Sequence, residues 1–138
     1  MSIFQRSVAG TLRNRLREVA RTFSGEPPTP EENRLRLELV LKARKELAGG
    51  QADLLRLLGP TAAADALGDA ERVAAYAESL AVEAMINDAA GQTDRAEALR
   101  RQAVTIAREA QRRAAVPDSE IERLITEGGR LDVAQSSE

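Results

Sequence analysis

The N-terminal part of the chain repeats an apolar position at every third or fourth step. The positions of this stripe are Phe4, Val8, Leu12, Leu16, Val19 and Phe23. Such spacing collects side chains on one face of an α-helix, so the sequence predicts an amphipathic helix over residues 2–24. Most of the remaining positions are basic, at Arg6, Arg13, Arg15, Arg17 and Arg21. The stretch GEPPTP at residues 25–30 breaks the pattern, and we expect a linker there that leaves the first helix detachable from the body.

A strong helix start follows this linker. Thr29 can cap a helix, Pro30 suits its first turn, and Glu32 closes a capping box. The stretch RLRLELVLK alternates as a strand would, but an apolar stripe at helical spacing runs through the same region, and the capping signal favours the helix. This stripe consists of Leu35, Leu39, Ala43 and Leu47. We predict a helix over residues 31–48 and, after a Gly-Gly pair, a short helix over residues 52–58.

The segment over residues 61–90 is predicted to be one long helix, with Gly68 as the position of a break or kink. Beyond Gly68, its apolar residues lie on two faces. One face carries Val73, Ala77, Leu80 and Ala84, and the other carries Ala75, Val82 and Ile86. A helix that is apolar on two faces usually lies between neighbours, so we expect residues 70–90 to form the central helix.

The next helix is predicted over residues 94–115, where small and large apolar residues alternate in a heptad-like seam. The seam consists of Ala96, Leu99, Ala103, Ile106 and Ala110. We expect this helix to pair antiparallel with the central helix across the turn at Gly91. Pro117 ends the segment, a Ser-x-x-Glu box that begins at Ser119 is expected to cap a last short helix, and residues 128–138 form a polar tail.

Three stretches share the pattern Gly-polar-x-Asp: GQAD, GQTD and GRLD. The first two follow helices that share a Leu-x-x-x-Ala pairing, which indicates a duplicated hairpin. We interpret the pattern as turn chemistry, in which Gly50 or Gly91 closes one helix and a polar side chain caps the next. Asp53 is the expected cap after the first glycine, and Thr93 or Asp94 after the second.

Composition narrows the fold class. The chain of 138 residues contains 25 alanines and three aromatic residues, and strand-forming residues are sparse. Such a composition favours close packing of helices over a sheet. We therefore predict an all-α fold, in which a small antiparallel bundle of about four to six helices, at residues 31–127, follows the detachable helix. No stretch is long and apolar enough to span a membrane, and we expect a cytoplasmic protein.

The absence of two residue types excludes most catalytic chemistry. His and Cys do not occur, so the commonest general base, the thiol nucleophile and most zinc sites cannot be built. Glu78, Glu83 and Asp88 step by five residues and therefore point in different directions around a helix. We interpret Tyr76 as a packing residue with a satisfied hydroxyl. The sequence predicts no enzyme, no catalytic residue, no cofactor and no metal site.

Part of the chain resembles a tetratricopeptide-type hairpin. The stretch GQTDRAEALRRQAVTIARE has the Gly-polar turn of that family, with Ala96 and Ala103 at its small packing positions. Glu83 and Asn87 depart from the motif, which has apolar or aromatic residues there. The resemblance covers residues 72–109 and implies a module that binds peptides or partner proteins in a groove, whereas a generic antiparallel bundle accounts for the same residues without that family.

The opening MSIFQR is similar to the start of phage-shock and vesicle-inducing membrane proteins. That resemblance implies binding to an anionic membrane surface through the amphipathic helix, although the long coiled coil of the family is missing. The alternative is that the stripe of this helix packs on the body or on a second copy of the chain.

Nucleic-acid binding is a further class of function to consider. Arg101, Arg108 and Arg112 share one face of the helix predicted over residues 94–115. However, the isoelectric point near 5.4 and the lack of aromatic residues between the arginines argue against DNA or RNA as a partner. Charge is uneven along the chain: residues 59–91 carry −5 and residues 92–116 carry +3, which favours pairing of these two helices.

We therefore predict a non-catalytic interaction or scaffolding module whose partner is another protein or a second copy of the chain, as a homo-oligomer. A peripheral membrane protein that uses the N-terminal helix is the alternative. The candidate contact residues are Phe4, Arg6, Arg13, Arg17, Phe23, Arg101, Arg108 and Arg112.

Overall fold

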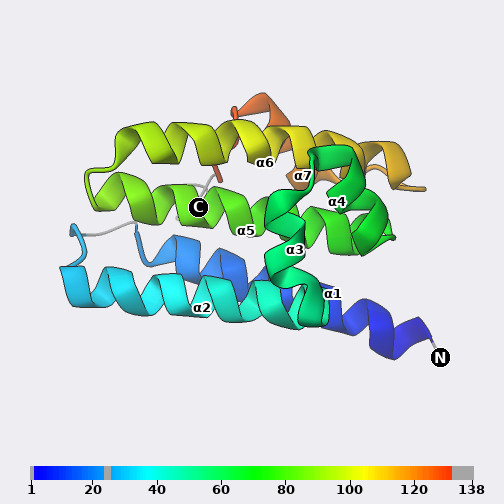
Figure 1. The fold of residues 1–138 in the computed structure, drawn as a ribbon, viewed down its shortest axis with the longest axis horizontal. Helices are drawn as coiled ribbons and strands as arrows, with labels where there is room; N and C mark the ends of the chain where they lie inside the picture. The colour runs from blue at the N-terminus through cyan, green and yellow to red at the C-terminus, as the bar shows by residue number, and fades with distance from the viewer. Residues whose placement is uncertain (1, 24–25, 132–138) are drawn as a thin grey trace.

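A computed structural model describes residues 2–23 and 26–131, with side chains from residue 8 onward. Over these residues the chain forms seven α-helices, one 3₁₀ turn and no strand, so the predicted all-α fold is confirmed (Figure 1). The elements are α1 (Ser2–Arg21), α2 (Pro30–Ala48), η1 (Gly49–Gln51), α3 (Ala52–Leu57), α4 (Pro60–Leu67), α5 (Ala70–Ala89), α6 (Thr93–Arg113) and α7 (Ser119–Thr126). None of the described helices is long and apolar enough to cross a membrane.

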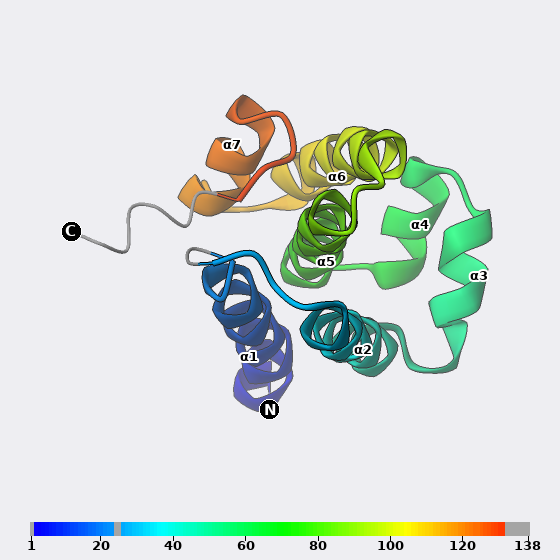
Figure 2. The same cartoon turned by 90° about the vertical axis from the view of Figure 1, so that its left-hand side faces the viewer.

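Helix α5 is the centre of the molecule, as its two apolar faces predicted. Every residue from Val73 to Ala84 is buried. Viewed end-on, α5 lies between α6 on one side and α1 and α2 on the other, with α4 beside it and α3 farther out (Figure 2). Alanines at positions such as Ala77 and Ala81 have no exposed surface, and their small side chains let the neighbouring helices approach closely.

The long helix expected over residues 61–90 is divided into α4 and α5. Gly68 has φ +94°, a left-handed conformation that L side chains rarely adopt and that interrupts the helix. Asp69 then caps α5, because its carboxylate accepts a hydrogen bond from the backbone N–H of Arg72 at 2.9 Å. The break or kink predicted at Gly68 is therefore a complete break.

Helix α6 packs antiparallel on α5 through the predicted seam, whose five members are all buried. The predicted caps are wrong, however. Helix α6 begins at Thr93 itself, so Thr93 and Asp94 lie inside its first turn, and Gln92 precedes it without a side-chain hydrogen bond. Helix α3 likewise includes Asp53 in its first turn and has no side-chain cap. At the last helix, Asp118 rather than Ser119 is the cap.

Helix α2 has the predicted capping box, in which Thr29 and Glu32 bond each other's backbone N–H at 2.9 and 3.1 Å. Its buried face differs from the predicted stripe. Leu35 is 48% exposed and Leu39 is 55% exposed. The face turned toward the bundle carries Asn33, Val40, Ala43, Arg44, Leu47 and Ala48. Leucines occur on several sides of α2, so apolar spacing alone does not determine its rotation. The buried ion pair between Arg44 and Glu83 of α5 also favours the face that is turned inward.

Helix α1 packs against α5 and α2. Its stripe from Leu12 to Val19 is buried in the same core as the rest of the bundle. Among the described residues of the predicted tail, Gly129 is buried and Leu131 packs against the core. Residues 132–138 lie outside the described part of the chain.

Candidate functional site

The predicted contact residues do not form one surface. Phe4 and Arg6 belong to α1, but their side chains lie outside the described part of the structure. Arg13 and Arg17 meet at the fully buried carboxylate of Glu78 in α5. Arg13 bonds both oxygens of Glu78 at 2.9 Å through Nε and Nη2, and its Nη1 bonds Asp118 at 2.9 Å. These two arginines therefore connect α1 to the body.

Arg13 and Asp118 each stabilise the charged form of the other. Burial alone would lower the pKa of Arg13, but Glu78 and Asp118 outweigh it and hold that pKa above its ordinary value. Burial would likewise raise the pKa of Asp118, and the hydrogen bond and charge of Arg13 hold it below its ordinary value instead. Both groups are therefore charged at neutral pH, and their charges are used inside the molecule.

The other predicted contact residues lie elsewhere. Phe23 is half-buried. The guanidinium carbon of Arg36 lies over the Phe23 ring, 4.4 Å from the ring centre. Arg101, Arg108 and Arg112 are exposed on the outer side of α6. Of these three, Arg101 and Arg112 form ion pairs within their own helix, with Glu97 and Glu109.

A polar pocket that the sequence did not single out lies between four helices. Arg44 comes from α2, Arg56 from α3, Tyr76 and Glu83 from α5, and Arg95 from the start of α6. Leu80, Ala98, Leu99 and Gln102 complete the lining. We call this cavity of about 220 Å³ the arginine–tyrosine pocket. It brings three guanidinium groups against one carboxylate, which leaves the lining with two positive charges in excess.

The inner wall of this pocket is held by a chain of hydrogen bonds. Arg44 donates from Nε to Ser79 Oγ at 3.0 Å and from Nη2 to Glu83 at 2.8 Å. Ser79 in turn donates to the backbone carbonyl of Tyr76 at 2.6 Å. Arg95 approaches the second oxygen of Glu83 at 3.6 Å. Because the side chains of Arg44 and Glu83 are no more than 9% exposed, packing fixes their positions.

Tyr76 is buried in the core, as predicted. The residue is 1% exposed and lines the pocket, and its hydroxyl makes no hydrogen bond with any residue that the structure describes. The Arg44 guanidinium lies over its ring, 5.7 Å from the centre. Burial raises the pKa of Tyr76, against the opposing charges of Arg44 and Arg56. The hydroxyl is thus neutral at physiological pH and remains a hydrogen-bond donor.

Comparisons with family models, with curated proteins and with solved structures find no match to this chain.

A second cavity, of about 630 Å³, adjoins the arginine–tyrosine pocket, because Glu83 and Arg95 line both. It lies between the start of α2, which contributes Pro30 and Leu37, and the end of α5, which contributes Ile86.

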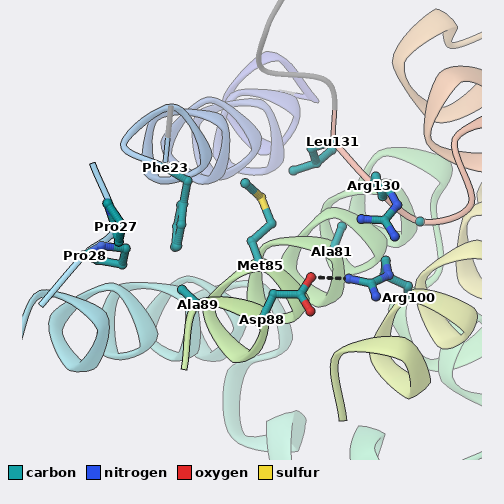
Figure 3. A pocket seen from close by; sticks show the side chains of 11 residues that line it. Phe23, Pro27, Pro28, Ala81, Met85, Asp88, Ala89, Arg100, Arg130 and Leu131 are labelled. Atoms are coloured by element: carbon teal, nitrogen blue, oxygen red, sulfur yellow. Dashed lines mark hydrogen bonds and ion pairs between the residues drawn. The ribbon is translucent and has the colours of Figure 1, made fainter. Parts of the chain in front are cut away.

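A third cavity, of about 450 Å³, lies on the other side of α5 (Figure 3). Phe23, Met85 and Leu131 form its apolar side. Its polar side is an ion pair of 2.6 Å between Asp88 and Arg100. Burial would lower the pKa of Arg100, but Asp88 and Glu97 outweigh it and hold that pKa above its ordinary value. The charge of Arg100 is therefore already neutralised.

Most of the exposed large apolar side chains of the described chain belong to α2 and α3. Of seven large apolar residues that are strongly exposed in the described chain, five lie between residues 35 and 57. Leu41 lies about 200° around α2 from Leu39 and therefore on another side of that helix. The remaining four are Leu35, Leu39, Leu54 and Leu57, from 48% to 83% exposed, and we call them the leucine surface. No group of three or more His, Cys, Asp or Glu in the described chain is placed to hold a metal ion.

Proposed function

We propose that this protein is a non-catalytic module that binds another protein chain through the leucine surface. The observation that carries the proposal is the concentration of exposed leucines on α2 and α3. Scattered exposed apolar residues are normal on a soluble domain, but a cluster on adjacent elements marks an interaction site.

The packing of α2 supports this proposal. One face of the helix already fills the core with Val40, Ala43 and Leu47. Leu35 and Leu39 lie one turn apart on another face, which no described element covers. A helix with two apolar faces usually has neighbours on both, and the second neighbour of α2 would be the partner chain.

Charged residues border the leucine surface, as a polar rim borders the apolar centre of many protein interfaces. Arg34 pairs with Glu31 at 2.6 Å and with Glu38 at 3.5 Å, beside the exposed leucines. An apolar strip with a polar rim suits a partner that presents its own apolar side chains, such as an amphipathic helix. The resemblance of residues 72–109 to a tetratricopeptide-type hairpin supports the same class of function.

Site-specific photo-crosslinking in the cells that produce the protein tests this proposal. A photoreactive residue at position 57 should give a protein adduct of defined mass, whereas the same residue at position 108 should not. The double variant Leu35→Gln/Leu39→Gln should lower the yield at position 57 by about 10-fold or more, since each leucine contributes about 1 kcal/mol of burial. The absence of any adduct at position 57 would contradict the proposal.

The matched control is Val8→Gln/Val116→Gln, which removes two exposed apolar side chains outside the leucine surface. This variant should leave the adduct unchanged. Light scattering of the purified protein then tells whether the adduct is a second copy of the chain or a different protein. An equal loss of adduct in both double variants would show a general effect of surface hydrophobicity and would contradict a specific face.

A further inference from the structure

We infer that the arginine–tyrosine pocket is a binding site for an oxyanion, a single carboxylate or phosphate group. The inference goes beyond the proposed function, because it rests on other residues than the leucine surface. It follows from the hydrogen-bonding inventory of the lining, from the burial of its inner wall and from its size.

The lining has many hydrogen-bond donors and few acceptor groups to pair with them. Arg56 makes no ion pair or hydrogen bond with any described residue, and Arg95 has only the 3.6 Å approach to Glu83. The hydroxyl of Tyr76 also has no partner in the described chain. The one carboxylate of the lining, Glu83, is already bonded by Arg44. A group that offers several acceptor lone pairs and negative charge would complete this set, and carboxylates and phosphates are such groups.

Burial fixes the inner wall of the pocket. Arg44 is 4% exposed and is held by Ser79 of α5, and Tyr76 is 1% exposed. An electrostatic interaction in such an environment is stronger than in water, and a preformed wall loses little entropy when a ligand binds. Arg56 and Arg95 lie at the rim, where a ligand can reach them from solvent.

The volume limits the ligand to a small group. A cavity of about 220 Å³ is several times the share of roughly 30 Å³ that one water molecule occupies in the liquid. It is smaller than the roughly 300–1,000 Å³ of sites that enclose a drug-sized molecule. A carboxylate or a phosphate fits, either as a free ion or as the end of an acidic side chain or a phosphorylated residue.

The linings of the second and third cavities have a smaller excess, of one positive charge each. Arg13 is matched by Glu78 and Asp118, and Arg100 by Asp88 and Glu97. The arginine–tyrosine pocket differs because its three arginines share one lining carboxylate, that of Glu83.

Tyrosine fluorescence provides a direct test, because Tyr76 is the single tyrosine of the chain and there is no Trp. The full chain is titrated with inorganic phosphate and, separately, with an oligoglutamate peptide, at ionic strength held constant with sodium chloride. We expect a saturable change in emission with at least one of the two probes. Saturation by phosphate alone identifies a phosphate group as the ligand, and saturation by the peptide alone identifies a carboxylate.

The double variant Arg56→Gln/Arg95→Gln should weaken that binding by at least about 10-fold, since two charge-assisted contacts are lost. The matched control is Arg101→Gln/Arg108→Gln, which removes the same charge from the outer side of α6 and should change the affinity less than twofold. Circular dichroism verifies that both variants fold.

Two results would overturn the inference: a linear response to both probes, or an equal loss of affinity in the two double variants. The crosslinking at position 57 does not depend on the pocket. A failure here and a failure of the proposed function are therefore distinguishable.

Discussion

The hydroxyl of Tyr76 lies where burial and charge act in opposite directions. Burial favours its neutral form and raises its pKa. The cations of Arg44 and Arg56 lower that pKa, and Glu83 raises it, but the net direction is upward. A donor that stays protonated beside three guanidinium groups is suited to hold an oxyanion without changing its own charge.

The pKa of Tyr76, the single tyrosine of the chain, can be measured by spectrophotometric titration. We expect a native midpoint above the ordinary pKa of 10.0 and above that of the urea-unfolded chain. Because the pKa is raised in the folded state, the associated stability is present below the unfolded midpoint and is lost as the pH rises through the folded one. Arg56→Gln should raise the native midpoint further, since Arg56 lowers it. A native midpoint at or below the unfolded one would contradict the packing of Tyr76.

At the scale of the elements, the carboxylates of α5 determine which neighbour meets which face. Glu78, Glu83 and Asp88 are five residues apart, which turns each by about 140° from the last. Glu78 accordingly meets α1, Glu83 meets α2 and Asp88 meets α6, each through an arginine. One helix thus presents a different ion pair to each of three partners.

The sequence predicted the elements well and their faces less well. Glycine, proline and the Thr29 box mark most helix ends, because these signals act within a few residues. The rotation of α2 was not predictable from apolar spacing, since leucines surround it and Arg44 must reach Glu83 on another helix. The caps at Thr93 and Ser119 were misplaced by one residue or more, a scale at which several polar neighbours compete.

The docking of the segment after α7 onto α6 depends on one glycine. A Cβ at Gly129 would lie 2.5 Å from the carbonyl oxygen of Arg100, and its φ is +92°. Gly128 has φ +68° but open space around it. We expect Gly128→Ala to lower the free energy of unfolding by about 1–2 kcal/mol through backbone strain alone. Gly129→Ala should lower it by at least about 1 kcal/mol more through the clash. Urea denaturation compares the two, and equal losses would contradict this contact.

At the scale of the whole molecule, Arg13 joins three helices that are distant in the chain. Its guanidinium bonds Glu78 of α5 and Asp118, the cap of α7, while its own residue lies in α1. Side chains drawn from separate helices carry no local pattern, so neither this junction nor the arginine–tyrosine pocket could be read from the sequence. Both depend on the packed arrangement of several elements.

Removal of the Arg13 side chain should lower the free energy of unfolding strongly. Arg13→Gln leaves the buried carboxylate of Glu78 with only the contact to Arg17 at 3.0 Å. We expect a loss of about 3 kcal/mol in the free energy of unfolding, the lower end for breaking a buried ion pair. Arg15→Gln removes an exposed pair with Glu46 at 3.4 Å and should change stability by less than about 0.5 kcal/mol. Similar losses in the two variants, measured by urea denaturation, would contradict the special position of Arg13.

The Arg13 junction also bears on the order in which the molecule assembles. Arg13 and Asp118 are 105 residues apart, whereas α5 and α6 are joined by a short turn. Contacts between neighbours in the chain close with a small loss of entropy, and distant ones close at a larger loss. The α5–α6 hairpin is therefore expected to form early and the junction late. On a ribosome, the guanidinium of Arg13 would meet Asp118 only after most of the chain had been synthesised.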